Sequence, residues 1–239
     1  EAIFKALQEA LPEKVTAAWE RTLGLRTTGW DPRRGRPYHD VNFIAGRGGG
    51  GGTYGADGYD HIGSIVTAGG LITQDYEMYE LADPHHLILH EYWTDSAGAG
   101  RWRGGLGVKT VCRLEGDDTL VVVSGDEEGA SGLLGGKSGT PNKLALVYPD
   151  GRRQEVHPWD IVPHIPKGTV YMLDAGGGGG FGDPHERLAE KVLDDVRKGV
   201  VSSVKAREDY GVVVDPDTFE LDEELTAALR AGEGLVKAQ

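Results

Sequence analysis

The sequence predicts an α+β fold: a largely antiparallel, β-rich core with glycine-rich loops, followed by short helices. From residue 86, short β-rich runs are separated by glycine or Asp-Gly turns, and helical spacing replaces them after Asp183. The connections between the runs are too short for many crossover helices, which favours antiparallel pairing. We therefore expect a single domain, 1–239, with a β-rich core at about 40–182 and a helical tail at about 183–239.

The amino-terminal elements follow from periodicity and turn residues. Residues 2–11 predict a short helix that Pro12 ends. Residues 29–62 are rich in Gly, Pro, Asp and Tyr, so we expect mainly loops with one short strand near Val41–Ala45. The β-rich runs that follow are Leu87–Trp93, Gly107–Leu114, Thr119–Ser124, Leu144–Tyr148 and Thr169–Leu173, and Asp150-Gly151 predicts a hairpin turn.

Helix signals mark the last third of the chain. Asp183 is a candidate N-cap, with Pro184 at the first helical position and Glu186 completing a capping box. The predicted buried stripe is Leu188, Val192 and Val196, and Gly199 ends this helix. Further elements are predicted as a helix at Val204–Asp209, a strand at Val212–Val214 and a helix at Asp222–Arg230.

Charge and composition exclude several classes of protein. The net charge of −13 disfavours binding to nucleic acid or anionic membranes, which requires clustered basic residues. The chain lacks a run of roughly 18 apolar residues that could span a bilayer. Its one cysteine, Cys112, excludes an internal disulfide. We expect a soluble, cytoplasmic protein without nucleic-acid or membrane partners.

Clusters of glycine are the unusual feature of this composition, because 38 of the 239 residues are glycine. Gly178, Gly179 and Gly180 lie between a predicted strand and the helix start at Asp183, which resembles a phosphate-binding turn. Asp183 would place a carboxylate where the phosphate should bind, so a structural or substrate-facing loop is favoured. Gly136-Lys137-Ser138 lacks the spacing of a P-loop, and we expect no ATP binding by this chain.

Histidines and aspartates suggest one candidate acid–base site. On a strand, His86 and His90 are separated by roughly 13 Å, too far for one metal ion. Asp57 and His61 lie close together in a glycine-rich loop, with His39 upstream, and form the predicted catalytic group. A polar loop closed by its own hydrogen bonds is the alternative. We expect no metal ligand in this chain.

Two arginines form the candidate anion site. Arg101 and Arg103 flank a tryptophan directly after a glycine-rich segment. Their guanidinium groups could hold a substrate carboxylate or phosphate in a bidentate manner. Equally, they could pin neighbouring loops by binding backbone carbonyls and a carboxylate. With Gly178, Gly179 and Gly180 they make up the predicted substrate-binding residues.

Four ordered motifs give the chain a resemblance to a known family. The segment 95–107, DSAGAGRWRGGLG, resembles the D-S-G-G-x-G-x-x-R-G-G-x-G signature of the hydantoinase B/oxoprolinase family. Residues 134–139, LGGKSG, match the last six positions of its L-x-G-G-x-x-G block. Residues 178–184 resemble G-G-G-G-[YF]-G-D-P, and 209–213 resemble the closing D-Y-G-V-V. The resemblance covers only the carboxy-terminal part of such subunits.

The resemblance implies a subunit of an ATP-dependent complex that either carboxylates ketones or opens cyclic amides. Residues 80–84, ELADP, and 57–61, DGYDH, resemble acetone carboxylase and favour the carboxylase branch slightly. A non-catalytic scaffold of such a complex is the third reading. The expected partners are a hydantoinase A-type subunit that binds ATP and the missing amino-terminal half. ATP is expected on the partner and a divalent metal in the missing half, with no cofactor bound by this chain.

Overall fold

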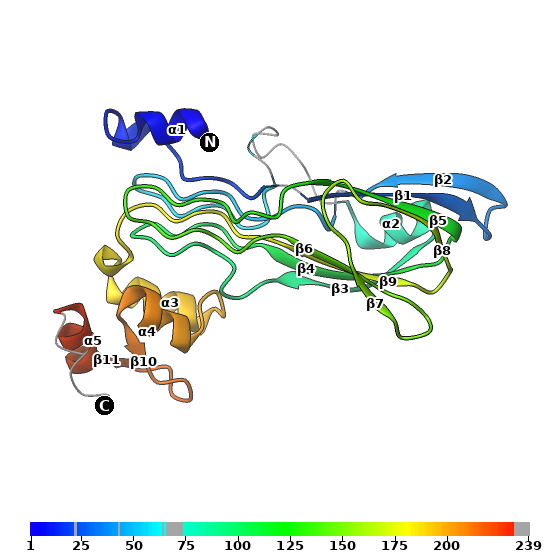
Figure 1. Cartoon of the computed structure of the whole chain (residues 1–239). Coiled ribbons are helices and arrows are strands. Elements are labelled where there is room, and N and C mark those ends of the chain that lie inside the picture. Colours follow the sequence, from blue (N-terminus) through cyan, green and yellow to red (C-terminus); the bar gives the residue numbers. More distant parts are fainter. Residues whose placement is uncertain (22, 43, 64, 66–73, 232–239) are drawn as a thin grey trace.

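The computed structural model describes residues 1–21, 23–42, 44–63, 65 and 74–231. Two β-sheets lie at one end of an elongated molecule, and long glycine-rich segments run side by side from the sheets to the other end (Figure 1). The helices α3, α4 and α5 lie beside the far part of these segments. The predicted α+β fold with antiparallel sheets is confirmed.

The four-stranded sheet has the order β2-β1-β5-β8, and all its pairs are antiparallel. The strands are β1 (Leu23–Asp31), β2 (Arg36–Val41), β5 (Asp117–Gly125) and β8 (Ile161–Ile165). The expectation of loops before Val41 is wrong, because β1 and β2 form a hairpin there. Alternating burial on β1, with Leu23, Leu25 and Thr27 inside, favours this strand despite the polar residues between them.

The five-stranded sheet has the order β3-β4-β9-β6-β7 and is also antiparallel. Its strands are β3 (His85–Tyr92), β4 (Val108–Leu114), β6 (Lys143–Val147), β7 (Arg153–Glu155) and β9 (Val170–Ala175). The four predicted runs that fall in this sheet and the hairpin at Asp150-Gly151 are confirmed, and the turn places Gly151 at a φ of 85°.

One hydrophobic core fills the space between the sheets. Leu25 and Val121 from one sheet belong to the same buried cluster as Leu146 and Leu173 from the other. Cys112 is also in this cluster, and burial raises the pKa of its thiol to about 12, so it is not a nucleophile at neutral pH. The unpredicted helix α2 (Tyr76–Ala82) lies beside β3 and buries Tyr79 in the core.

The glycine-rich segments form a bundle of extended chains, in which the neighbour that a glycine approaches changes with a repeat of three residues. A Cβ atom added to Gly49 or Gly52 would meet segment 102–105, whereas one on Gly48 or Gly51 would meet segment 17–20, and the one on Gly48 would also meet Gly176. A Cβ on Gly50 would approach Tyr59 instead. Residues three apart thus face the same neighbour, which is the repeat of a polyproline II-type helix.

Hydrogen bonds between the segments replace the internal bonds that such helices lack. In segment 176–182, the N–H groups of Gly178, Gly179 and Gly180 donate to the carbonyl oxygens of Gly105, Ala18 and Lys137 at 3.0, 2.8 and 2.9 Å. Successive residues therefore bind three different neighbours. Close approach of these backbones requires glycine, because a side chain would occupy the position of a neighbouring chain.

The helical tail packs around its own small core of Val192, Val196, Ala206, Tyr210 and Val212. Its elements are η3 (Pro184–Glu186), α3 (Ala189–Arg197), α4 (Ser203–Tyr210), β10 (Val213–Val214), β11 (Leu221–Asp222) and α5 (Glu223–Arg230). The predicted helices after residue 200 and the short strand are confirmed within about one residue.

The predicted start of the first tail helix is partly wrong. Asp183 caps only a single 3₁₀ turn, because its side chain accepts the N–H of His185 at 2.9 Å and the α-helix begins at Ala189. Glu186 pairs with Arg101 rather than completing a capping box. Leu188 precedes the helix and is 62% exposed, so it does not belong to the buried stripe.

The amino-terminal helix α1 (Ala2–Leu7) is shorter than predicted, and a 3₁₀ turn, η1 (Pro12–Lys14), follows it. Ile3, Leu7 and Leu11 are exposed. Within the described ranges, no helix combines the length and apolar character needed to cross a bilayer.

Candidate functional site

Asp57 lies at the junction between the glycine bundle and the helical tail. Its two carboxylate oxygens accept hydrogen bonds from the Nη1 and Nη2 atoms of Arg187 at 2.7 and 2.9 Å. Oδ1 also accepts the backbone N–H of Arg103 at 2.9 Å. Burial raises the pKa of Asp57, but the bonds and charges of Arg187 and Arg103 outweigh it, and the pKa is lowered.

Arg103 is buried in the same ion network. Its Nη1 donates to Asp60 Oδ1 at 3.1 Å and to the carbonyl of Gly104 at 2.8 Å, while Nε donates to Asp195 at 3.4 Å. Asp195 also binds Arg187, at 2.8 Å. The network therefore joins the arginine-rich motif to helix α3, and the guanidinium of Arg103 is engaged by protein groups rather than turned toward solvent.

Arg101, in contrast, remains accessible, with half of its side chain exposed. Its guanidinium lies 4.8 Å above the ring of Trp102 and pairs with Glu186 at 3.1 Å. Trp102 also contacts Tyr54, with ring centroids 5.0 Å apart. Of the two arginines predicted to bind an anion, Arg101 is thus the more exposed, and the role of both in substrate binding stays a prediction.

His61 lies close to His90, a residue that was not among the predicted site residues. The two ring centroids are 5.1 Å apart, and the planes meet at 69°. The Nδ1 atom of His61 lies 2.9 Å from the carbonyl oxygen of Arg47. Burial, together with nearby charge, lowers the pKa of His61 and brings that of His90 to about 4, so both rings are neutral at pH 7.

His39 is separated from the other two predicted catalytic residues. It lies on β2, where its Nδ1 atom is 2.8 Å from Thr28 Oγ1 on the paired strand. Strand β2 is at the end of the molecule opposite the outer part of the glycine bundle (Figure 1). Asp57 and His61 lie on the same segment after Gly50 but have different partners, Arg187 and His90, and His39 lies apart from both.

Gly178, Gly179 and Gly180 are enclosed by other segments of the bundle. A Cβ at these positions would overlap the carbonyl oxygens of Gly50, Ser131 and Ala99, respectively. Their N–H groups donate to other segments, so they are not available to a ligand in this arrangement. Packing explains these glycines without a substrate, and their predicted role in substrate binding stays a prediction.

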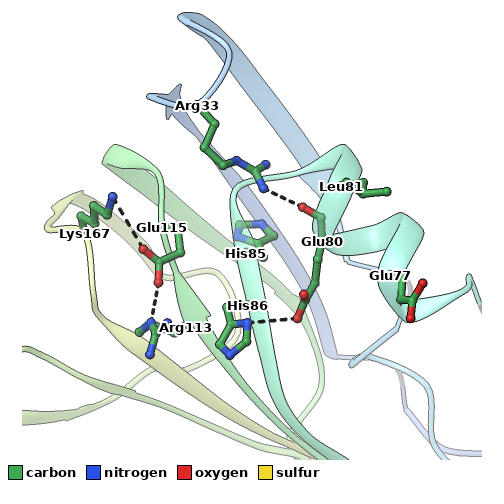
Figure 2. A pocket seen from close by; sticks show the side chains of 9 residues that line it. All are labelled: Arg33, Glu77, Glu80, Leu81, His85, His86, Arg113, Glu115 and Lys167. Carbon is green, nitrogen blue, oxygen red and sulfur yellow. Dashed lines mark hydrogen bonds and ion pairs between the residues drawn. The ribbon is translucent and has the colours of Figure 1, made fainter.

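A separate cavity of about 570 Å³ opens between the β1–β2 hairpin, α2 and the turns that follow β4 and β8. Figure 2 shows several of its charged groups paired with one another, while Glu77 has no partner among the residues drawn. Glu115 binds Lys167 at 3.7 Å and also Arg113, and Glu80 binds His86 at 3.2 Å. Opposite charges balance here, so the cavity favours neither anions nor cations. The lining residues are Arg33, Glu77, Glu80, Leu81, His85, His86, Arg113, Glu115 and Lys167.

Sequence patterns gave no signal for Arg187, Asp195 or His90 as partners of the predicted site. Arg187 and Asp195 are eight residues apart across a 3₁₀ turn and a helix start, and their partners come from positions 57 to 103. His90 lies on strand β3, and its approach to His61 depends on a loop without periodicity.

A family model described as hydantoinase B/oxoprolinase matches residues 1–184. The chain is 36% identical to the caprolactamase subunit beta of Pseudomonas jessenii over 97% of its own length, which is 41% of that protein. It is 27% identical to the acetone carboxylase alpha subunit of Xanthobacter autotrophicus, over 81% of this chain and 30% of that protein. It thus spans about two fifths or less of these relatives.

The fold is also found in solved structures. The ATP-dependent caprolactamase from Pseudomonas jessenii matches with a TM-score of 0.78 and 33% identity, over 95% of this chain and 40% of that one. A nucleotide-free acetone carboxylase has the same fold, with a TM-score of 0.78 and 24% identity over 96% of this chain and 36% of that one. The four sequence motifs, the family model and the shared fold agree: the chain belongs to the hydantoinase B/oxoprolinase family.

Proposed function

We propose that this chain is the carboxy-terminal part of a subunit in an ATP-dependent complex that hydrolyses cyclic amides. One observation carries the choice of reaction: the chain is 36% identical to the caprolactamase subunit over 97% of its length, against 27% over 81% for the acetone carboxylase subunit. Ketone carboxylation is the second candidate. The motifs at 57–61 and 80–84, which resemble acetone carboxylase, support it.

In this proposal the chemistry is divided between polypeptides. A hydantoinase A-type partner binds and cleaves ATP and activates the amide or, in the alternative, bicarbonate. The second active site forms between this chain and the amino-terminal part of the same type of subunit. The relatives support such an arrangement, since this chain spans 41% of the caprolactamase subunit.

Within this chain, His61 and Arg101 are the predicted site residues best placed to act. The neutral ring of His61 can accept a proton from an attacking water molecule. Arg101 can attract the carboxylate that ring opening releases. Asp57 and Arg103 hold the loops that carry these residues, because both are engaged in the buried ion network.

A substrate panel tests the reaction. The native complex, purified with its partner chains, is assayed for ATP cleavage with hydantoin, 5-oxoproline, caprolactam, acetone and acetophenone, with and without bicarbonate. We expect stimulation by one of the cyclic amides without bicarbonate. Stimulation only by a ketone together with bicarbonate would move the assignment to carboxylation. A complex whose turnover is unchanged when this chain is omitted would make it a scaffold.

A further inference from the structure

We propose that the cavity between the β1–β2 hairpin, α2 and the turns after β4 and β8 binds a zwitterion with well-separated charges, of the class of an ω-amino acid. Acidic and basic groups of the cavity come from different walls (Figure 2). A buried ring nitrogen without a partner among the described residues belongs to its floor. The inference does not depend on the proposed reaction, because the charges of the cavity select the class of ligand.

Helix α2 supplies the acidic wall. Glu77 has no partner among the residues that Figure 2 draws. Glu80 accepts the N–H of Leu87 at 2.7 Å and pairs with His86 at 3.2 Å, and both contacts use Oε1. The carboxylate of Glu77 and the Oε2 atom of Glu80 can therefore accept hydrogen bonds from a ligand ammonium group.

Arg113 and Lys167 form the basic wall. Both pair with the carboxylate of Glu115, so two cations share one anion and this wall has an excess of positive charge. Burial raises the pKa of Glu115, but Arg113 and Lys167 outweigh it, and the pKa is lowered. The two basic side chains are 44% and 51% exposed. This wall therefore suits a ligand carboxylate.

The two walls are too far apart for an α-amino acid. Glu80 is held against β3, whereas Arg113 lies on the neighbouring strand β4 and Lys167 precedes β9, the next strand of the sheet. Strands are about 4.8 Å apart, so the walls are separated by on the order of 10 Å. An α-amino acid carries both charges on one carbon atom. A chain of methylene groups can span the distance, and Leu81, which is 59% exposed, offers it an apolar contact.

His85 supplies the polar atom of the floor. Its side chain is fully buried, and its ring packs against Tyr79 of α2 with centroids 5.6 Å apart. Nε2 lies 3.0 Å from Thr27 Oγ1 and 3.4 Å from Asp40 Oδ2. The carboxylate can only accept, so Nε2 carries the hydrogen, and Nδ1 of the neutral ring is an acceptor.

Nδ1 of His85 has no hydrogen-bond partner within the part of the chain that the structure describes. Buried polar atoms of this kind are rare, because each one costs free energy until a donor reaches it. An ammonium group held by the acidic wall would provide the donor. An ordered water molecule could do so as well, and the experiment below distinguishes the two.

The division of charge excludes simpler ligands. A lone anion would gain only the basic wall and would be repelled by Glu77 and Glu80, and a lone cation would meet the excess charge of Arg113 and Lys167. A zwitterion places each of its charges against the opposite one. Under the proposed function, opening of a lactam ring yields such a compound, so the cavity would bind a product of that reaction class.

Calorimetric titration with 6-aminohexanoate tests the site on the full chain, or on the native complex should the chain need its partners to fold. We expect one equivalent to bind with submillimolar affinity. Hexanoate and hexylamine each lack one of the two charges, and glycine carries both on one carbon atom. Each of these three should bind on the order of tenfold more weakly or less.

Glu77→Gln and Lys167→Gln each remove one charge from one wall at an exposed position. Both should weaken binding of 6-aminohexanoate on the order of tenfold. His85→Phe keeps a ring but removes Nδ1, and it should weaken binding as well. Glu91→Gln, at an exposed glutamate of β3 that does not line the cavity, is the matched control and should bind as the wild type does.

Three results would overturn the proposal: no binding at millimolar 6-aminohexanoate, equal affinity for its single-charge analogues, or wild-type affinity in both Glu77→Gln and Lys167→Gln. Wild-type affinity in His85→Phe alone would assign Nδ1 to a water molecule and remove His85 from the site. Melting without ligand checks that the variants fold. Should His85→Phe unfold, the two exposed variants decide.

Discussion

At the scale of single residues, the buried ion network is the feature with the clearest energetic consequence. Arg103 and Arg187 share three carboxylates, those of Asp57, Asp60 and Asp195. Removal of one partner from a buried pair leaves an uncompensated charge and costs about 3–5 kcal/mol. The network is therefore sensitive to loss of any one member, although replacing it entirely by apolar residues need not be destabilising.

Arg103→Lys should destabilise the chain by on the order of 1–3 kcal/mol, because an ammonium keeps the charge but cannot bond Asp60, Asp195 and the Gly104 carbonyl together. Arg101→Lys is the matched control at the exposed position two residues away, and its effect should stay within about 0.5 kcal/mol. Urea unfolding measures both. If both variants lose equally little stability and only Arg103→Lys loses turnover, Arg103 acts in substrate binding instead.

Asp57 should make stability depend on pH in the acid range. Its pKa in the folded chain is lowered from the ordinary value of 3.8, so its ionised form is stabilised by folding. This contribution is fully present above pH 3.8 or so and is lost as the pH falls through the folded pKa. The stability difference between wild type and Asp57→Asn should therefore shrink below pH 3.8. A stability difference between the two proteins that stays constant or grows below pH 3.8 would contradict a lowered pKa of Asp57.

At the scale of elements, the glycine bundle is the part of the fold that the sequence did not predict. From the sequence, the glycine clusters were predicted to be loops. A strand shows apolar residues at every second position and an α-helix at about every 3.6 positions, and a polyproline II-type helix shows neither pattern. Their threefold repeat is visible only in which neighbour each glycine approaches, as Gly48 and Gly51 show. Strands such as β4 and β9 were predictable, because buried and exposed residues alternate along them.

Gly178→Ala should destabilise the chain by about 3 kcal/mol or prevent folding, because its Cβ would overlap the carbonyl of Gly50. Gly50→Ala is the matched control in the facing segment. Its Cβ would lie 3.2 Å from Cγ2 of Ile62, a side-chain atom that can shift, and we expect a loss below about 1 kcal/mol. Thermal and urea unfolding compare the two. Similar losses at both positions would show that the close packing is not the cause.

Asp183→Ala should cost about 1 kcal/mol, because it removes the cap of the turn η3. We expect no binding of ATP by the isolated chain before or after this change, since the neighbouring glycine N–H groups already donate to other segments. Calorimetry with ATP checks this point. Micromolar binding that bulky substitutions at Gly178 or Gly180 abolish would restore a phosphate-binding loop.

At the scale of the whole molecule, the sequence predicted the family, the antiparallel sheets and most of the tail. It did not predict the β1–β2 hairpin, whose core positions alternate with arginine and threonine. For the candidate site, the motifs located Asp57, His61 and the two arginines but not their partners. Contacts such as Asp57 with Arg187 join positions 130 residues apart, and local patterns carry no information about them.

The central claim is that the chain acts as the carboxy-terminal part of a larger catalytic unit, and reconstitution tests it most directly. The chain, a separate polypeptide matching the amino-terminal part of the relatives, and the ATP-cleaving partner are mixed singly, in pairs and together. The measurement is substrate-dependent ATP cleavage. We predict turnover only when all three are present, with the chain silent alone. Equal turnover by the other two polypeptides without this chain would contradict the claim.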